Sequence, residues 1–175
     1  MLYCDYIEIP EVLGLKLYIR EKVFSWGDRF TVKDDAGRDK YVIQGEVFSW
    51  GKKLHVYDML GKEVAFVKQE IWSFLPKFYV FCGGRQVAQI RKEFTFLFPK
   101  FSIDGLGWEI NGSFWEHEYE ILQGGRTIVT ISKEWMTWGD SYELNVADPA
   151  HEIVALAVVL TIDCVREAAN NANNN

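Results

Sequence analysis

The chain has 175 residues, of which 49% are hydrophobic and 15% aromatic, and its formal net charge is -6. This length fits one domain with a large core. The acidic balance argues against bulk affinity for nucleic acid or an anionic membrane, but leaves room for a local basic patch. Three cysteines without metal-ligand spacing favour free thiols over a disulfide framework. Because no secretion signal opens the sequence, we expect a cytoplasmic protein.

A motif recurs five times along the chain. Val-Phe-Ser-Trp-Gly at 23–27 returns at 47–51, and three related segments follow. The five copies begin at Lys22, Glu46, Glu70, Glu93 and Glu134, at steps of 24, 24, 23 and 41 residues. Each copy leads into a short alternating run, a polar or glycine turn and another run, which is the pattern of a β-hairpin. An insertion before the last copy adds strand on both sides of a predicted turn at Asn111–Gly112.

One long helix is predicted, at the end of the chain. Asp148 is a suitable N-cap, and every side chain in 153–160 is apolar, so this helix has no polar face to meet water. The apolar run is bounded by acidic residues and is shorter than the roughly 17–25 residues that span a membrane. We therefore expect a helix at about 149–168 that is enclosed by protein, followed by a disordered Asn-rich tail at 170–175.

The number of strands constrains the fold. Five hairpin units and the insertion supply roughly ten to twelve strands, more than an open twisted sheet usually carries. A closed barrel of that size has an interior too wide for the strand side chains alone to fill. Known eleven-stranded barrels, for example, enclose a central helix. The prediction is a mainly β single domain over residues 1–169: a closed antiparallel barrel of about 12 strands around a central apolar C-terminal helix.

The ordered motifs resemble one known family. They are Phe-Ser-Trp-Gly at 24–27 and 48–51, Leu-Pro-Lys-Phe at 75–78, Phe-Pro-Lys-Phe at 98–101, and the segments 112–121 and 138–144. This series resembles the bacterial branch of the LURP-one-related family, which belongs with the Tubby C-terminal domain and the phospholipid scramblases. The resemblance covers essentially the whole chain and implies the same barrel around a helix. It carries over no activity, because neither phosphoinositide-binding nor scrambling residues can be aligned here.

The candidates for chemistry are weak. His117 stands beside Glu118, but alternation along a strand would point the two side chains to opposite faces. His55 is expected on the outside of a strand, and His151 at the helix entrance. The sequence contains no phosphate-binding glycine loop and no nucleophile elbow. We therefore expect no cofactor, no metal and no enzymatic activity.

One pattern points to a surface. The seventh residue after the start of each of the first four copies is basic, namely Arg29, Lys53, Lys77 and Lys100, and the next residue is large and apolar. Alternation would turn the apolar residues inward and the basic ones outward, as a partial belt able to meet lipid phosphates. The other interpretation, which the sequence favours, is a set of solvated lysines that discourages edge-to-edge association.

Two hypotheses of function follow. The first is a non-catalytic barrel that binds anionic phospholipid at a membrane surface, or a protein partner, without binding nucleic acid and without spanning the membrane. The alternative is a small-molecule carrier or enzyme, which would use a pocket at the barrel end or between the helix and the wall.

Overall fold

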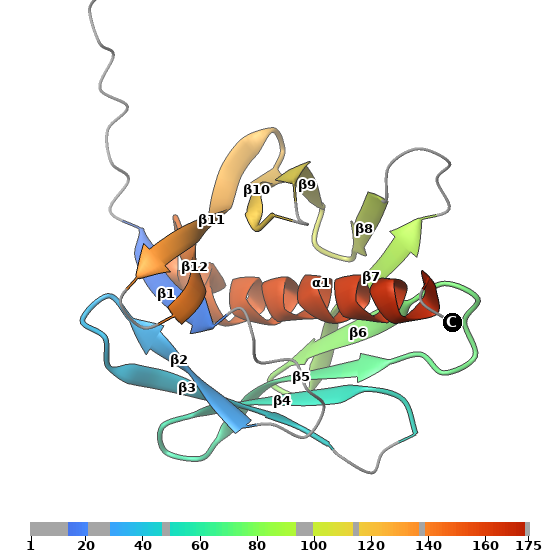
Figure 1. Cartoon of the computed structure of the whole chain (residues 1–175), viewed down its shortest axis with the longest axis horizontal. Coiled ribbons are helices and arrows are strands. Elements are labelled where there is room, and N and C mark those ends of the chain that lie inside the picture. Colours follow the sequence, from blue (N-terminus) through green and yellow to red (C-terminus); the bar gives the residue numbers. More distant parts are fainter. Residues whose placement is uncertain are drawn as a thin grey trace, which may run out of the picture.

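The structure is a computed structural model that describes residues 14–20, 29–46, 50–93, 100–113, 116–136 and 139–173. Twelve strands and a C-terminal helix make up this part of the chain (Figure 1). The elements are β1 (Leu15–Arg20), β2 (Arg29–Asp34), β3 (Asp39–Gly45), β4 (Lys53–Asp58), β5 (Glu63–Gln69), β6 (Lys77–Cys82), β7 (Arg85–Glu93), β8 (Lys100–Asp104), β9 (Trp108–Ser113), β10 (Glu118–Gln123), β11 (Arg126–Met136), β12 (Gly139–Val146), the 3-10 turn η1 (Pro149–His151) and α1 (Glu152–Asn173).

The strands form one antiparallel sheet in the order β8-β7-β6-β5-β4-β3-β2-β1-β12-β11-β10-β9. The sheet curls around α1, as Figure 1 shows. Its two end strands, β8 and β9, contact each other, although no hydrogen-bonded ladder joins their described residues. The predicted barrel of about 12 strands is confirmed, with a seam between β8 and β9 that leaves it nearly closed.

The core is built from the inward side chains of the strands and from all faces of α1. From Ala155 to Val165 every side chain of the helix is at most 2% exposed. The helix packs mainly against β5, β6 and β7. An apolar helix without a polar face thus gains the enclosure that its sequence requires. Among the described residues, no helix is both long enough and apolar enough to cross a membrane.

The two ends of α1 differ in how closely they match the sequence pattern. At the start, Asp148 caps as expected, since its Oδ1 accepts a hydrogen bond of 2.9 Å from the backbone N of Ala150. At the other end α1 continues to Asn173, so residues 170–173 are helical instead of belonging to a disordered tail. Alanines, the strongest helix formers, are interspersed there, and Ala169 is only 2% exposed.

The predicted turn at Asn111–Gly112 is wrong, because both residues lie within β9 and pair with β10. Gly112 has a φ of 111°, a conformation that glycine tolerates and other residues rarely adopt. A Cβ at this position would lie 2.7 Å from the carbonyl oxygen of Glu118 and 2.9 Å from the Cα of Tyr119. The absence of a side chain at Gly112 therefore allows β9 and β10 to approach each other closely.

Replacing Gly112 with Ala should lower the free energy of unfolding by more than about 1 kcal/mol, because the new methyl group combines an unfavourable φ with a backbone clash. Chemical denaturation would measure the loss. Gly61→Ala is the matched control, since Gly61 has a φ of 82° but nothing within 4 Å of its added Cβ. Equal losses for the two variants would show that the clash with β10 contributes nothing.

Candidate functional site

Alternate connections of an antiparallel barrel lie at the same end. We call one end the loop end; it carries the connections after β1, β3, β5, β7, β9 and β11, of which residues 46, 50–52, 70–76 and 116–117 are described. The turn end is the opposite one. Helix α1 runs from the turn end, where Tyr41 donates a 2.8 Å hydrogen bond to Glu152, to the loop end, where Lys52 forms a 3.1 Å ion pair with Glu167.

The four basic residues singled out from the repeats all lie at the loop end. Each is the first residue of its strand: Arg29 of β2, Lys53 of β4, Lys77 of β6 and Lys100 of β8. The residue that follows each points toward the core, since Leu54, Phe78 and Phe101 are at most 5% exposed and Phe30 packs partly buried against them. The predicted inward and outward alternation at these four positions is confirmed.

Glutamates at the start of the repeats lie beside these cations, a pairing that was not among the predictions from the sequence. Glu46 forms an ion pair with Lys53 at 2.8 Å. Glu93 lies directly opposite Lys100 in the ladder between β7 and β8. The pKa of Glu46 is lowered, first by the hydrogen bond from Lys53 and then by that from His55. A constant spacing of seven residues between glutamate and lysine was the available signal.

Both signs of charge are present at the loop end. The described cations there include the four repeat residues and Arg20, Lys52, Lys68 and Lys92, and the described carboxylates include Glu46, Glu70, Glu93, Glu116, Glu118 and Glu167, the last near the C-terminal end of α1. The four basic residues of the repeats therefore lie within a mixed-charge end of the barrel.

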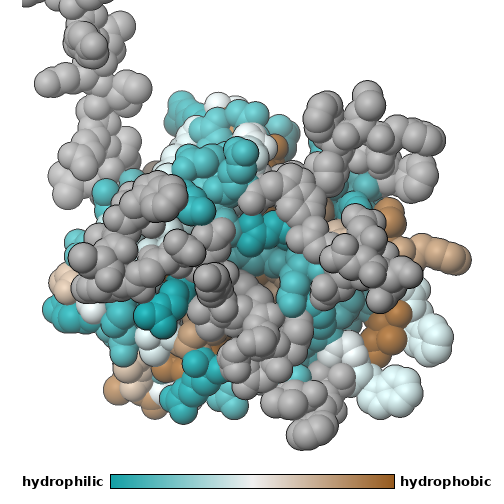
Figure 2. All heavy atoms as spheres, viewed as in Figure 1, coloured by the Kyte–Doolittle hydropathy of each residue, from teal (hydrophilic) through white to brown (hydrophobic). Residues whose placement is uncertain are grey.

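Four large apolar side chains project from the loop end, and we call them the aromatic patch. Their exposed fractions are 85% for Trp50, 44% for Ile71, 90% for Trp72 and 108% for Phe74. The two connections that carry them touch, because a Cβ on Gly51 would lie 3.0 Å from Cγ1 of Ile71. Brown and pale side chains accordingly project from the right-hand side of Figure 2, the side toward which α1 runs in Figure 1.

Glu70 fixes the shape of the β5–β6 connection. Its carboxylate accepts a 3.0 Å hydrogen bond from Tyr79 Oη, and its pKa is lowered first by that bond and also by the backbone N–H of Trp72. The backbone N of Glu70 donates to the carbonyl of Lys77 at 2.8 Å, which closes the connection at its base. A loop held in this way presents Trp72 to solvent. The equivalent segments at 21–28, 94–99 and 137–138 lie outside the described residues.

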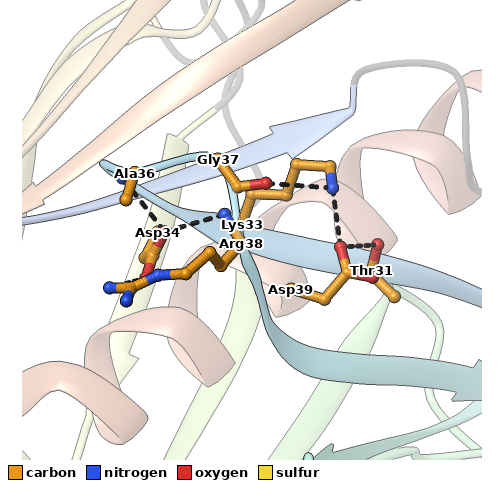
Figure 3. A network of polar contacts seen from close by, with 7 residues as sticks. All are labelled: Thr31, Lys33, Asp34, Ala36, Gly37, Arg38 and Asp39. Carbon is orange, nitrogen blue, oxygen red and sulfur yellow. Dashed lines mark hydrogen bonds and ion pairs between the residues drawn. The ribbon is translucent and has the colours of Figure 1, made fainter.

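The turn end is organised differently, as the β2–β3 turn in Figure 3 shows. Asp34 accepts hydrogen bonds from the backbone N of Ala36 and of Arg38, and its other oxygen binds the Arg38 guanidinium at 2.9 Å. These bonds lower the pKa of Asp34. Asp39 is held by Lys33 at 2.7 Å and by Thr31 at 2.9 Å. The carboxylates of Asp34 and Asp39 are engaged with their own hairpin, so the network is structural.

A buried polar network joins the barrel wall to α1. His117, in the β9–β10 connection, is 0% exposed and its Nε2 lies 3.1 Å from Oδ1 of Asp163. Tyr142 of β12 donates a 2.5 Å hydrogen bond to Oδ2 of Asp163, and its ring stacks on His117 with centroids 4.3 Å apart. His117 and Glu118 do not form a catalytic pair, because the side chain of His117 is buried while that of Glu118 is exposed.

Hydrogen-bond geometry fixes the tautomer of His117. A guanidinium N of Arg166 lies 3.3 Å from Nδ1, and because arginine can only donate, Nδ1 must be the acceptor. Nε2 then carries the hydrogen and donates it to Asp163. Burial, and then Asp163, raise the pKa of Tyr142 well above its ordinary value, so this phenol remains a donor. Tyr119 Oη, also buried, has no hydrogen-bond partner among the described residues.

The remaining candidates have structural surroundings. His55 lies between two carboxylates, with Nδ1 2.6 Å from Glu63 and Nε2 2.9 Å from Glu46, and its ring packs on Phe66. His151 ends η1 and contacts the ring edge of Trp108. Within the described part of the chain, no group of three or more His, Cys, Asp or Glu could hold a metal ion.

The two cysteines that the structure describes offer no activated nucleophile. Cys82 and Cys164 are free thiols, and Cys4 lies outside the described residues. Burial raises the pKa of Cys82 to about 11 and raises that of Cys164 further still. Because the thiolate is the reactive form, both groups are inert near neutral pH.

Comparison with known proteins identifies the family. The sequence model of the LURP-one-related family matches residues 15–163, which is most of the chain. The chain belongs to the LURP-one-related family. It is 34% identical over 151 residues to an uncharacterised protein, YxjI, of Bacillus subtilis (strain 168), with 86% of this chain and 93% of that protein covered. The resemblance drawn from the ordered motifs is thereby confirmed.

The fold of this LURP-one-related protein is similar to a solved X-ray structure of a protein from Arabidopsis thaliana. The TM-score is 0.59, the sequence identity is 14%, and the match covers 86% of this chain and 91% of that one. At such low identity the likeness shows the fold alone. The family match begins at the start of β1 and ends at Asp163, so the polar network lies almost entirely within it.

Proposed function

We propose that this LURP-one-related protein is a non-catalytic cytoplasmic module that binds anionic phospholipid surfaces through the loop end of its barrel. The observation that supports the proposal is the convergence of Arg29, Lys53, Lys77 and Lys100 on one end of the sheet. Near an anionic leaflet each Lys or Arg contributes about 1 kcal/mol of attraction. Several such residues at one end therefore favour a single docking orientation.

The glutamates of the loop end reduce this attraction, but an exposed pair holds its lysine weakly. In the pair between Lys53 and Glu46 the side chains are 28% and 37% exposed. Ion pairs at this exposure typically contribute about 0–1 kcal/mol, so a lipid phosphate can compete for the lysine at small cost. Arg29 and Lys100 are both exposed. The basic residues can therefore exchange contacts with neighbouring glutamates for contacts with lipid phosphate oxygens.

The carrier or enzyme hypothesis has less support. It would need a cavity that reaches the space between α1 and the barrel wall. A hollow of about 160 Å³ at the turn end is lined by the first residues of β5, by Phe81 of β6 and by Gly83 and Gly84 of the β6–β7 turn, but by no residue of α1. This hollow gives no access to the helix.

Changing Arg29, Lys53, Lys77 and Lys100 together to Glu should reduce binding to vesicles that contain phosphatidylserine by about tenfold or more, since the variant replaces attraction with repulsion. Vesicle sedimentation at physiological salt would measure it, and binding to pure phosphatidylcholine should be weak for both proteins. The control variant makes the same change at the turn end, at Arg38, Lys62, Arg85 and Arg126.

The fold of each variant is checked by its thermal unfolding, and the four corresponding Gln substitutions, which remove charge without repulsion, provide a second series. Unaltered vesicle binding after charge reversal at the loop end would refute the proposal. So would an equal loss of binding after reversal at the turn end, because orientation through one end could not then be the cause.

A further inference from the structure

We infer that the aromatic patch inserts into the interfacial region of the bilayer, so that the barrel docks end-on with the C-terminal end of α1 nearest the membrane. This inference rests on the proposed lipid binding and assigns its apolar component. The patch consists of Trp50, Ile71, Trp72 and Phe74, on two touching connections of the loop end. Its occupant is the outer part of an anionic bilayer and not a soluble headgroup.

Core packing does not account for the exposure of these side chains. Trp50, Trp72 and Phe74 have exposed fractions of 85% or more, although the barrel interior is filled by α1 and the inward strand residues. A projecting group of large apolar side chains marks an interaction surface rather than an ordinary exposed residue. Aromatic rings are also the side chains that concentrate at membrane–water interfaces, and Trp is foremost among them.

The position of the cations relative to the patch suits a bilayer. Phe74 precedes Lys77 by three residues, and Trp50 precedes Lys53 by three as well. Three residues of chain span at most about 10 Å, and bends at both segments shorten that distance. Interfacial apolar side chains enter the membrane by about 5–10 Å. Rings inserted to that depth would leave Lys53 and Lys77 at the level of the lipid phosphates, so charge and apolarity complement the same surface.

The backbone geometry keeps the patch in this position. The base of the β5–β6 connection is closed by the bond from Glu70 N to the carbonyl of Lys77, and Gln69 N donates to the carbonyl of Lys52 at 2.8 Å, which ties the two connections together. Side chains presented by a fixed loop pay less conformational entropy on insertion. The aromatic patch is thus arranged before any lipid is met.

The test removes the aromatic patch without changing charge, by the triple substitution Trp50→Ser, Trp72→Ser and Phe74→Ser. The matched control is Met59→Ser with Leu60→Ser, since these residues are 55% and 94% exposed at the turn end. Binding to vesicles of phosphatidylcholine with phosphatidylserine is measured at about 0.1 M and about 0.5 M NaCl, because high salt screens the ionic attraction but not the apolar one. Acyl chains brominated near the headgroup report tryptophan insertion by quenching fluorescence.

We expect the unmodified protein to keep part of its binding at the higher salt and to be quenched by brominated lipid. The triple variant should lose at least about tenfold in binding at high salt and most of the quenching, as expected from burying even one aromatic ring. The turn-end control should behave as the unmodified protein. Soluble glycerophosphoserine, offered as a competitor, should not displace the protein from vesicles.

Other outcomes separate this inference from the proposed function. Normal vesicle binding by the triple variant, together with loss of binding by the charge-reversed variant, would overturn insertion but leave headgroup binding standing. No vesicle binding by the unmodified protein would overturn both. A dimer that becomes monomeric in the triple variant, without any quenching by brominated lipid, would assign the patch to a second copy of this chain and would also overturn insertion.

Discussion

Replacing Ala157 with Asp should prevent the chain from folding. Ala157 is 0% exposed in the middle of α1, and the side chains around it on the helix are apolar. A carboxylate there would be buried among hydrocarbon without an ion-pair partner, at a cost of several kcal/mol. Because a domain is stable by only about 5–15 kcal/mol, and because the helix forms the centre of the core, little stability would remain. Near-UV circular dichroism and gel filtration would show the loss of the folded monomer.

The control is Ala36→Asp, the same substitution at an exposed position in the β2–β3 turn, which should leave the thermal unfolding temperature almost unchanged. An Ala157→Asp variant that folds normally but no longer associates with membranes would contradict this expectation. That result would mean that α1 is a membrane anchor attached to a barrel that folds without it.

The parts of this fold that could be predicted are those that leave a periodic mark in the sequence. The repeats that begin at Glu46 and Glu70 predict hairpins of similar length, and the uninterrupted apolar segment after Asp148 predicts a helix shielded from water on all sides. A barrel of that many strands needs a filler and the apolar helix needs an enclosure, so the two predictions support each other. The seam between β8 and β9 left no such mark, because it depends on how far the sheet curls and not on the sequence of one strand.

The buried network could not be predicted in the same way. His117, Tyr142 and Asp163 are far apart along the chain, and only the closing of the barrel around α1 brings them together. In the sequence, Asp163 marks only the polar end of an apolar run and shows no sign of its partners. His117 was placed in a strand, whereas it lies in a connection with a φ of 55°. A buried acid in an apolar helix was the available signal, since such a group requires partners.

The loop end was predicted in part. The belt of Arg29, Lys53, Lys77 and Lys100 follows from repeat spacing, and the structure places these residues at one end. The aromatic residues of the motif were interpreted only as a family signature. Alternation rules apply to strands, so they say nothing about whether Trp72 in a connection points inward or outward. Exposure of that ring is a tertiary property.

Replacing Asp163 with Ala should cost about 3–5 kcal/mol of unfolding free energy, the typical result of removing one partner from a buried charged network. The variant would leave the Nε2–H of His117 and the Oη–H of Tyr142 without acceptors, and the Arg166 guanidinium, which lies 3.6 Å from Asp163, without that carboxylate. Urea denaturation would measure the loss. The control Asp148→Ala removes the helix cap instead and should cost about 1 kcal/mol.

A double-mutant cycle distinguishes a network from separate contacts. Tyr142→Phe removes only the phenol donor, so in an Asp163→Ala background it should cost much less than in the unmodified protein, because its acceptor is already absent. Additive losses would show that the two residues stabilise the fold independently. Non-additive losses would instead show that one carboxylate on α1 couples β12 to the β9–β10 connection. Asp163 would then fasten the barrel wall to the helix on the β9 side of the seam. No hydrogen-bonded ladder joins the described residues of β8 and β9 at that seam.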